Sequence, residues 1–150
     1  MIHVVNKGKE GEREIVRLLR EVIEQCIASE PSWDAETMQL LRTAPQRNQN
    51  QSAVGGCDIN LLGIAFEVKR QQVVSIPAWW RQCTASAVSV NLLPVLLYRQ
   101  NNKAWNVVMR ADIPYSPTGA LTAVVRIDLD TFKAWFYQWV KDRVRRGLMT

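Results

Sequence analysis

The spacing of apolar residues along the chain predicts three helices. Apolar residues recur every three or four positions over 8–29, which is typical of an amphipathic helix. Pro77 suits the first turn of a second helix over 78–89. An aromatic stripe with the same spacing predicts a third helix over 130–146. These helices separate two groups of extended segments.

The segments between the helices are predicted to be strands and loops, because they are short apolar or alternating runs bounded by turn residues. Strands are predicted over 38–44, 58–63, 64–70, 92–99, 104–110 and 120–128, and loops over 30–37, 45–56 and 111–120. The order helix, strands, helix, strands, helix predicts a mixed α/β sheet. A length of 150 residues is most simply one domain, 1–150.

Composition narrows the chemistry that the chain can support. Nineteen Lys and Arg residues against fourteen Asp and Glu give a net charge of +5, which suits a polyanionic partner without requiring one. Three cysteines with no CxxC pair argue against disulfides and structural zinc. His3 is the only histidine, so catalysis must rest on carboxylates, lysine and a metal ion bound through oxygen. No apolar run approaches the ~20 residues of a membrane span, so we expect a cytoplasmic protein.

Three charged residues interrupt the predicted hairpin 58–70. Asp58 follows a Gly-Gly pair, while Glu67 and Lys69 lie within an otherwise apolar strand. Because side chains alternate along a strand, Glu67 and Lys69 point to the same face. Asp58 begins the partner strand and can lie opposite Glu67. The pattern predicts two carboxylates and a lysine at one point of the sheet.

Charged groups beside a core need a partner, and a divalent cation is a natural one. Mg²⁺ binds one or two carboxylates, polarises a phosphoryl group and activates a bound water. Lys69 could then position that water or offset charge on the phosphorus. The alternative is a salt bridge across a solvated hairpin. The basic, amide-rich run 69–72 favours the nuclease interpretation.

GGCDI followed by AFEVK resembles the motif of the PD-(D/E)xK nuclease superfamily, with Asp58, Glu67 and Lys69 in the motif positions. The segment NKGKEGERE (6–14) resembles the start of the archaeal-type Holliday-junction resolvases of that superfamily. The resemblance covers roughly residues 5 to 110, and Cys57 replaces a proline-like position. It implies a restriction-endonuclease-like mixed central β-sheet flanked by helices, to which the C-terminal helix is an addition.

The same resemblance implies roles for individual residues. Glu12 would join the metal ligands, and the neighbouring Arg13 would contribute to catalysis or to backbone binding. The metal ligands would be Glu12, Asp58, Glu67 and the carbonyl of Val68, holding Mg²⁺, for which Mn²⁺ substitutes. The superfamily also has an arginine on the strand before the active-site loop, for which Arg42 fits best and Arg47 is the second choice. Phosphates would contact Lys7, Arg13, Arg42, Arg47 and Arg70, whereas Glu10 and Glu14 are expected to be solvated.

The expected function is a Mg²⁺-dependent, structure-selective DNA endonuclease that is similar to a Holliday-junction resolvase. By analogy it would act as a homodimer on branched or four-way DNA, in a prokaryote or a phage. Two alternatives remain open. One is another PD-(D/E)xK nuclease of restriction, repair, or phage replication and recombination. The other is a non-catalytic DNA-binding module on the same fold.

Overall fold

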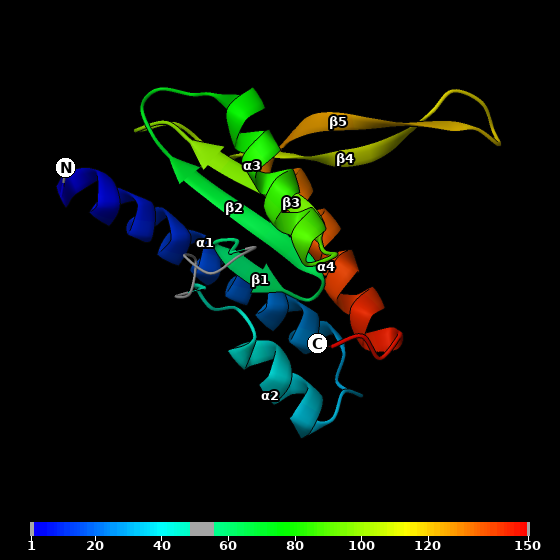
Figure 1. Cartoon of the computed structure of the whole chain (residues 1–150). Helices are drawn as coiled ribbons and strands as arrows, with labels where there is room; N and C mark the ends of the chain where they lie inside the picture. The colour runs from blue at the N-terminus through cyan, green and yellow to red at the C-terminus, as the bar shows by residue number, and fades with distance from the viewer. Residues whose placement is uncertain (1, 49–55, 150) are drawn as a thin grey trace.

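A five-stranded sheet with helices packed around it forms the protein, shown as a computed structural model that describes residues 2–48 and 56–149 (Figure 1). The elements are α1 (Ile2–Ser29), α2 (Ala35–Thr43), β1 (Ile59–Leu61), β2 (Ile64–Arg70), α3 (Ile76–Ser89), β3 (Leu93–Arg99), β4 (Asn106–Pro114), β5 (Ala120–Asp128) and α4 (Leu129–Arg145). The mixed α/β architecture expected for a restriction-endonuclease-like fold is confirmed, with α4 at its C-terminal end.

The strands lie across the sheet in the order of the chain. β1 and β2 form an antiparallel hairpin, whose turn places Leu62 and Gly63 at positive φ. β2 and β3 are parallel and are connected through α3, and β4 and β5 continue the sheet in antiparallel fashion. Arg70 and Arg99 are the last residues of β2 and β3 and are register partners, so the two arginines lie at the same end of these parallel strands.

Different helices cover the two faces of the sheet. Phe66 of β2 is fully buried in the main core and meets the rings of Phe132 and Phe136 of α4 edge-on, with centroids 6.2 and 6.3 Å away. On the opposite face, Ala65 packs with Ala87 of α3. α3 therefore lies in front of the sheet in Figure 1, and α1 and α4 lie behind it.

Residues 38–44 belong to a helix, so the predicted strand there is wrong. The carboxylate of Asp34 accepts a hydrogen bond from the Thr37 amide at 2.7 Å and caps the start of α2. Leu41 then turns inward and is fully buried. A seven-residue apolar run is too short for its periodicity to separate a strand from a helix.

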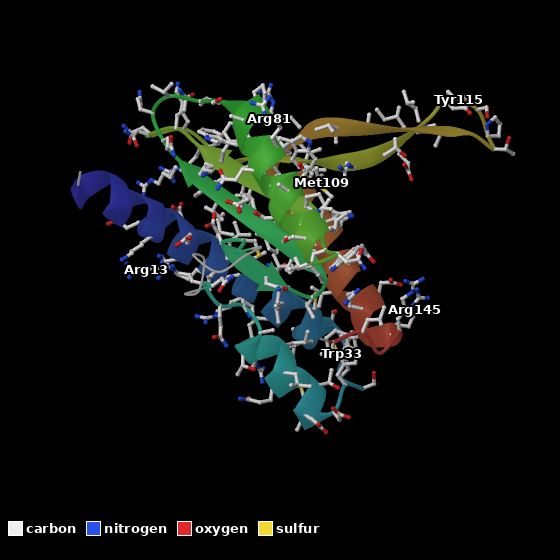
Figure 2. All side chains as sticks on the ribbon, viewed as in Figure 1. Arg13, Trp33, Arg81, Met109, Tyr115 and Arg145 are labelled. Carbon is white, nitrogen blue, oxygen red and sulfur yellow. The ribbon has the colours of Figure 1, made fainter. Side chains whose placement is uncertain are left out.

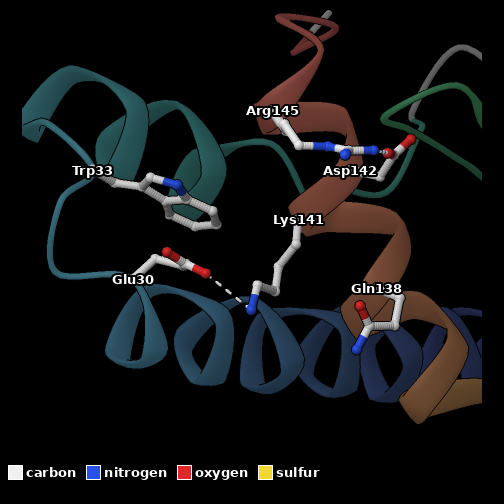
Figure 3. A pocket seen from close by; sticks show the side chains of 6 residues that line it. All are labelled: Glu30, Trp33, Gln138, Lys141, Asp142 and Arg145. Atoms are coloured by element: carbon white, nitrogen blue, oxygen red, sulfur yellow. Dashed lines mark hydrogen bonds and ion pairs between the residues drawn. The ribbon is translucent and has the colours of Figure 1, made fainter.

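The first and last helices meet at one end of the molecule. α1 begins earlier than predicted, at Ile2. None of the helices in 2–48 and 56–149 has the length and apolar character of a membrane span. Just beyond the end of α1, the Glu30 carboxylate forms an ion pair with Lys141 of α4, whose Nζ is 2.9 Å away (Figure 3). Both residues line a hollow between the end of α1 and α4, in which Arg145 pairs with Asp142.

β4 and β5 extend past the helices as a two-stranded arm (Figure 1). The sheet register continues to Pro114 and Ala120, so half of the loop predicted over 111–120 is strand. Tyr115, at the tip of the arm, is 75% exposed (Figure 2). The turn residues in 111–120 marked the tip correctly but hid the length of the strands beside it.

Candidate active site

Asp58 lies just before the first residue of β1, beside the part of β2 that continues beyond the β1 pairing. Its backbone amide donates to the Phe66 carbonyl at 3.0 Å, and its carboxylate accepts from the Val68 amide at 2.7 Å. The side chain therefore satisfies a backbone donor that β1 no longer reaches. Because the N–H and C=O of one residue in an extended strand point to the same side, the Val68 carbonyl faces the same edge as Asp58.

Glu67 is buried on the face of β2 that α3 covers, with only 2% of the residue exposed. The pairing of Ile59 with Phe66 sets Asp58 beside Glu67, and the side chains of Asp58 and of Ser86 on α3 both act on the Glu67 carboxylate. Lys69 lies two residues further along β2, on the same face as Glu67 and half-buried. The predicted meeting of Asp58 and Glu67 across the hairpin is confirmed. Ser86 was missed, because no local pattern shows which serine of a helix faces a strand.

The environment raises the pKa of both carboxyl groups. Burial is the main cause for Asp58, and the negative charge of Glu67 adds to it. Burial also raises the pKa of Glu67, against the lowering effects of its hydrogen bond to Asp58 and of the Lys69 charge. Two acids in contact in a buried place cannot both ionise at low cost, so the pair favours a proton or a cation as a partner.

Glu12 approaches this pair from α1. Gly11 makes the approach possible, because a Cβ on it would lie 3.3 Å from Cβ of Arg70, tighter than most contacts in proteins. Glu12 is 6% exposed, and its charge contributes to the raised pKa of Asp58 and of Glu67. Arg47 donates to its carboxylate from Nε at 2.9 Å and from Nη2 at 2.8 Å.

Arg47, and not Arg42, is the arginine that the structure brings to the site. Residue 47 forms a β-bridge with Ile59, which holds its side chain beside the start of the hairpin. Arg42 lies on α2 and pairs with Glu24 of α1, with its Nε 2.7 Å from the carboxylate. Glu24 is twelve residues beyond Glu12, or ~18 Å along a helix. The choice of Arg42 rested on the strand 38–44, which does not form.

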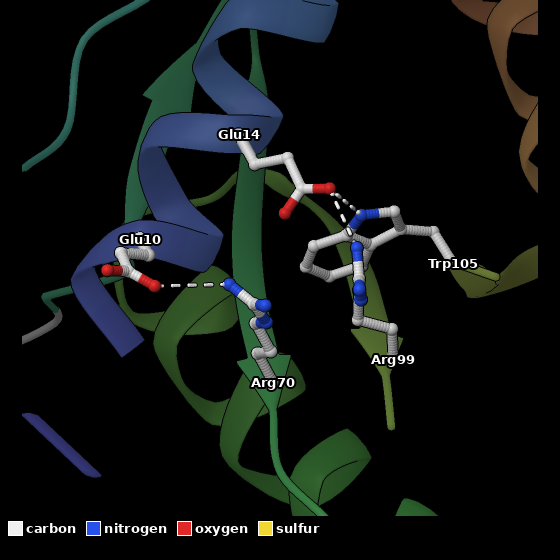
Figure 4. A network of polar contacts seen from close by, with 5 residues as sticks. All are labelled: Glu10, Glu14, Arg70, Arg99 and Trp105. Carbon is white, nitrogen blue, oxygen red and sulfur yellow. Dashed lines mark hydrogen bonds and ion pairs between the residues drawn. The ribbon is translucent and has the colours of Figure 1, made fainter. Parts of the chain in front are cut away.

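The other residues predicted to contact phosphate differ in their exposure and in whether a carboxylate already binds them. Arg13 is exposed on the side of α1 that faces away from the sheet (Figure 2). Arg70 reaches α1, where its Nη1 lies 3.3 Å from the Glu10 carboxylate (Figure 4). Lys7 lies on α1, but its side chain is outside the described part of the structure.

A second polar network binds α1 to the ends of the parallel strands (Figure 4). Glu14 accepts hydrogen bonds from Arg99 at 2.9 Å and from the Trp105 indole at 3.0 Å. Glu14 is therefore an anchor of α1, and the expectation that it is only solvated is wrong. The sequence contains an arginine at the end of each parallel strand, Arg70 and Arg99, but it does not show that α1 packs beside those strand ends.

The donors near Asp58 define what the site can hold. Within residues 2–48 and 56–149 there is no group of three or more His, Cys, Asp and Glu side chains arranged around a metal ion. Glu12 is turned to Arg47, which leaves the contacting pair of Asp58 and Glu67 as the side-chain donors. Two carboxylates and a backbone carbonyl are oxygen ligands, which suit a hard divalent cation that keeps part of its water shell.

A family model described as "Phage putative PDDEXK endonuclease" matches residues 3–118. The chain belongs to this family. Comparisons with curated proteins and with solved structures each gave no significant match. The matched span contains Glu12, Asp58, Glu67 and Lys69 of this PD-(D/E)xK protein. It ends before β5 and α4, in agreement with the expectation that the C-terminal helix is an addition.

Proposed function

We propose that this protein is a Mg²⁺-dependent DNA endonuclease whose site is built on Asp58, Glu67 and Lys69. The observation that carries the proposal is the contact between two carboxylates, one of them 2% exposed, with a lysine on the same strand face. A folded chain keeps such a pair at a cost unless a cation or a proton compensates it. Membership of an endonuclease family supports the phosphodiester as the bond that is hydrolysed.

The residues fit Mg²⁺, for which Mn²⁺ would substitute. Asp58, Glu67 and the Val68 carbonyl would hold the ion, and water and a phosphate oxygen would complete its shell. Glu12 would act as a third carboxylate through a bound water, because Arg47 already holds its side chain. Bound Mg²⁺ would polarise the phosphodiester and lower the pKa of the attacking water.

Each remaining side chain has a role that its position supports. Lys69 shares its strand face with Glu67, so its ammonium group can hold the attacking water or offset the charge that grows on phosphorus. Arg47 fixes Glu12 at the edge of the hairpin. The water oxygen adds to phosphorus and the bond to the 3′ oxygen breaks, leaving a 3′-hydroxyl and a 5′-phosphate, as the superfamily resemblance implies.

We infer branched DNA, and a four-way junction above all, as the substrate. The inference rests on the likeness of residues 6–14 to the resolvase opening segment, which includes Glu12 and Arg13. Symmetric cutting of a junction needs two active sites, so the active species would be a homodimer. A restriction or repair role on ordinary duplex is the competing function within the same family.

A cleavage panel tests both levels of the proposal. The wild-type protein is incubated with four-way junction, flap, nicked and linear DNA of one shared sequence, in Mg²⁺ and in EDTA. We expect Mg²⁺-dependent cleavage that is fastest on the junction. Cleavage of the linear duplex at the same rate would remove the resolvase assignment and keep the nuclease. Absence of Mg²⁺-dependent cleavage from all four substrates would refute the nuclease.

A further inference from the structure

A groove of about 610 Å³ runs beside α1, next to Glu12. It is lined by Arg13, Val16, Arg17, Arg20, Gln46 and Arg47. Four of these six residues are arginines and none is acidic. The groove thus concentrates positive charge that its own walls do not neutralise.

Three of the four groove arginines, Arg13, Arg17 and Arg20, have no carboxylate partner among the described residues, whereas Arg47 is held by Glu12. The side chains of Arg13 and Arg17 form no hydrogen bond or ion pair with the described residues 8–48 and 56–149, and both are exposed. Arg20 donates to a backbone carbonyl, that of Pro45, at 3.0 Å. Outside the groove, Arg42, Arg70, Arg99, Arg145 and Arg146 each contact a carboxylate. Arg110 and Arg126 instead contact the ring of Trp80 and the hydroxyl of Tyr98, so it is the clustering of the groove arginines, and not the lack of an acid alone, that sets the groove apart.

The arrangement of the charges suits a chain of phosphates. Arg13, Arg17 and Arg20 occur at i, i+4 and i+7, so they lie on one side of α1 and span ~10.5 Å of it. Each strand of duplex DNA carries one phosphate per ~3.4 Å of the duplex axis, so a row of this length can contact successive phosphates of one strand. Like charges at these spacings repel one another in the free helix, and an extended polyanion relieves that repulsion.

The groove also leads to the reaction site. Arg47 is part of its wall and at the same time binds Glu12, whose charge reaches Asp58 and Glu67. A strand lying along the arginines would therefore enter the site at Arg47. A small anion would occupy only one part of the groove. A chain of phosphates could contact the whole row of arginines and extend to the site.

We propose that the groove of Arg13, Arg17, Arg20 and Arg47 binds the phosphate backbone of the DNA strand that continues into the site of Asp58 and Glu67. This inference rests on the proposed function for the direction of the strand. Arg17 and Arg20 are the new residues that it assigns. Arginine suits the task, because its planar donor set matches phosphate geometry.

Binding can be tested without cleavage. The affinity of Arg13→Gln/Arg17→Gln for a short fluorescent duplex is measured by anisotropy in EDTA over a series of salt concentrations. The matched control, Arg145→Gln/Arg146→Gln, loses the same two charges at the far end of α4. We expect the groove variant to bind at least about tenfold more weakly. Its slope of log K against log salt should be about 1.8 smaller than in the wild type, ~0.9 for each lost phosphate contact.

The outcomes separate this inference from the nuclease assignment. A groove variant with wild-type affinity and salt slope would overturn the groove, even if the wild type cleaves DNA. Selective loss of binding in the groove variant would support it, even if the wild type cleaves nothing. Polyglutamate that competes as well as DNA of equal charge would also overturn it, because the groove would then accept any acidic chain. In a cleavage assay, Arg17→Gln should raise KM and leave kcat unchanged.

Discussion

Two hollows near α1 balance their charges in opposite ways. The groove beside Glu12 has four arginines and no acid among its lining residues. The hollow between the end of α1 and α4 is lined by Glu30, Trp33, Gln138, Lys141, Asp142 and Arg145. There each charge has a partner within the hollow, Lys141 with Glu30 and Arg145 with Asp142 (Figure 3).

This difference in charge pairing indicates which of the two regions binds a charged ligand. Paired charges at the far hollow fasten α4 to the end of α1, and they leave no net charge for a partner to neutralise. Near the site, exposed arginines lie beside carboxylates whose pKa is raised by burial and by one another. The chain keeps unbalanced charge of both signs there. A metal ion and a phosphate chain would balance them together.

The largest difference between the regions should appear when each loses a lysine. Lys69→Met removes the ammonium group beside Glu67, and we expect kcat for DNA cleavage to fall by about 10²–10⁴, the usual contribution of a proton-transfer or water-positioning group. Lys141→Met breaks the pair with Glu30 and should leave kcat unchanged. Quench-flow or gel assays at saturating DNA give both values. Equal losses would show that Lys69 acts through folding alone.

Two arginine–glutamate pairs should differ in their contribution to stability. In Arg47→Ala the Glu12 carboxylate, whose side chain is 8% exposed, loses its cation, and we expect a loss of ~1–3 kcal/mol of unfolding free energy. Arg42→Ala breaks a pair that is about half exposed on both sides and should leave the free energy of unfolding almost unchanged. Urea denaturation measures both, and similar midpoints for the two variants would contradict the burial argument.

Carboxyl groups in the two kinds of environment should respond to pH with opposite signs. Asp58 and Glu67 have a raised pKa in the folded protein, so their contribution to stability is present in acid and is lost as pH rises through that pKa. The hydrogen bond from Arg42 lowers the pKa of Glu24, so its contribution is present above the ordinary carboxyl pKa and is lost in acid. Each proton involved gives a slope of at most ~1.4 kcal/mol per pH unit.

The pH dependence of stability is measured by thermal melting over a pH series, once in EDTA and once in Mg²⁺. In EDTA the wild type should lose stability relative to Glu67→Gln as pH rises. The stabilisation by Mg²⁺ should grow over the same range, because the ion replaces protons on the pair. A stabilisation by Mg²⁺ that is independent of pH would count against a site on these carboxylates.

The smallest expected effect is a difference in stability between two glycine substitutions on α1, and it tests why α1 can lie so close to β2. A Cβ on Gly8 would touch nothing within 4 Å, so Gly8→Ala should stabilise the helix by ~0.5–1 kcal/mol. In Gly11→Ala the contact with Arg70 at 3.3 Å should cancel that gain. Thermal unfolding of the two variants gives the comparison. Equal stabilisation would show that α1 can move away from β2 freely.

The sequence predicts the positions of the site residues better than it predicts the surface around the site. Strand alternation places Glu67 and Lys69 on one face, and hairpin pairing brings Asp58 to Glu67, because both rules depend only on neighbouring residues. The sequence favours Arg42 over Arg47, because residues 38–44 fit a strand as well as they fit a helix. Asp34, three residues before Thr37, was the capping signal that would have indicated the helix.

The groove depends on tertiary pairing, which local patterns do not contain. In the sequence, Arg17 and Arg20 look like any exposed arginine of an amphipathic helix, and Glu14 looks like an exposed glutamate. Only the packed structure shows that Glu14 is held by Arg99 and Trp105, while Arg17 has no acidic partner among the described residues. The length of the β4–β5 arm was hidden for a similar reason, because its register is set by cross-strand bonds.

The most direct test of the central claim is DNA cleavage by Glu67→Gln in Mg²⁺. The change keeps the shape of a buried side chain and removes its charge, so the fold should persist and the EDTA melting temperature should not fall. We expect cleavage to drop about a thousandfold, or ~4 kcal/mol of transition-state stabilisation, with a matching loss of Mn²⁺ binding in calorimetry. Wild-type cleavage by a folded Glu67→Gln protein would contradict the account.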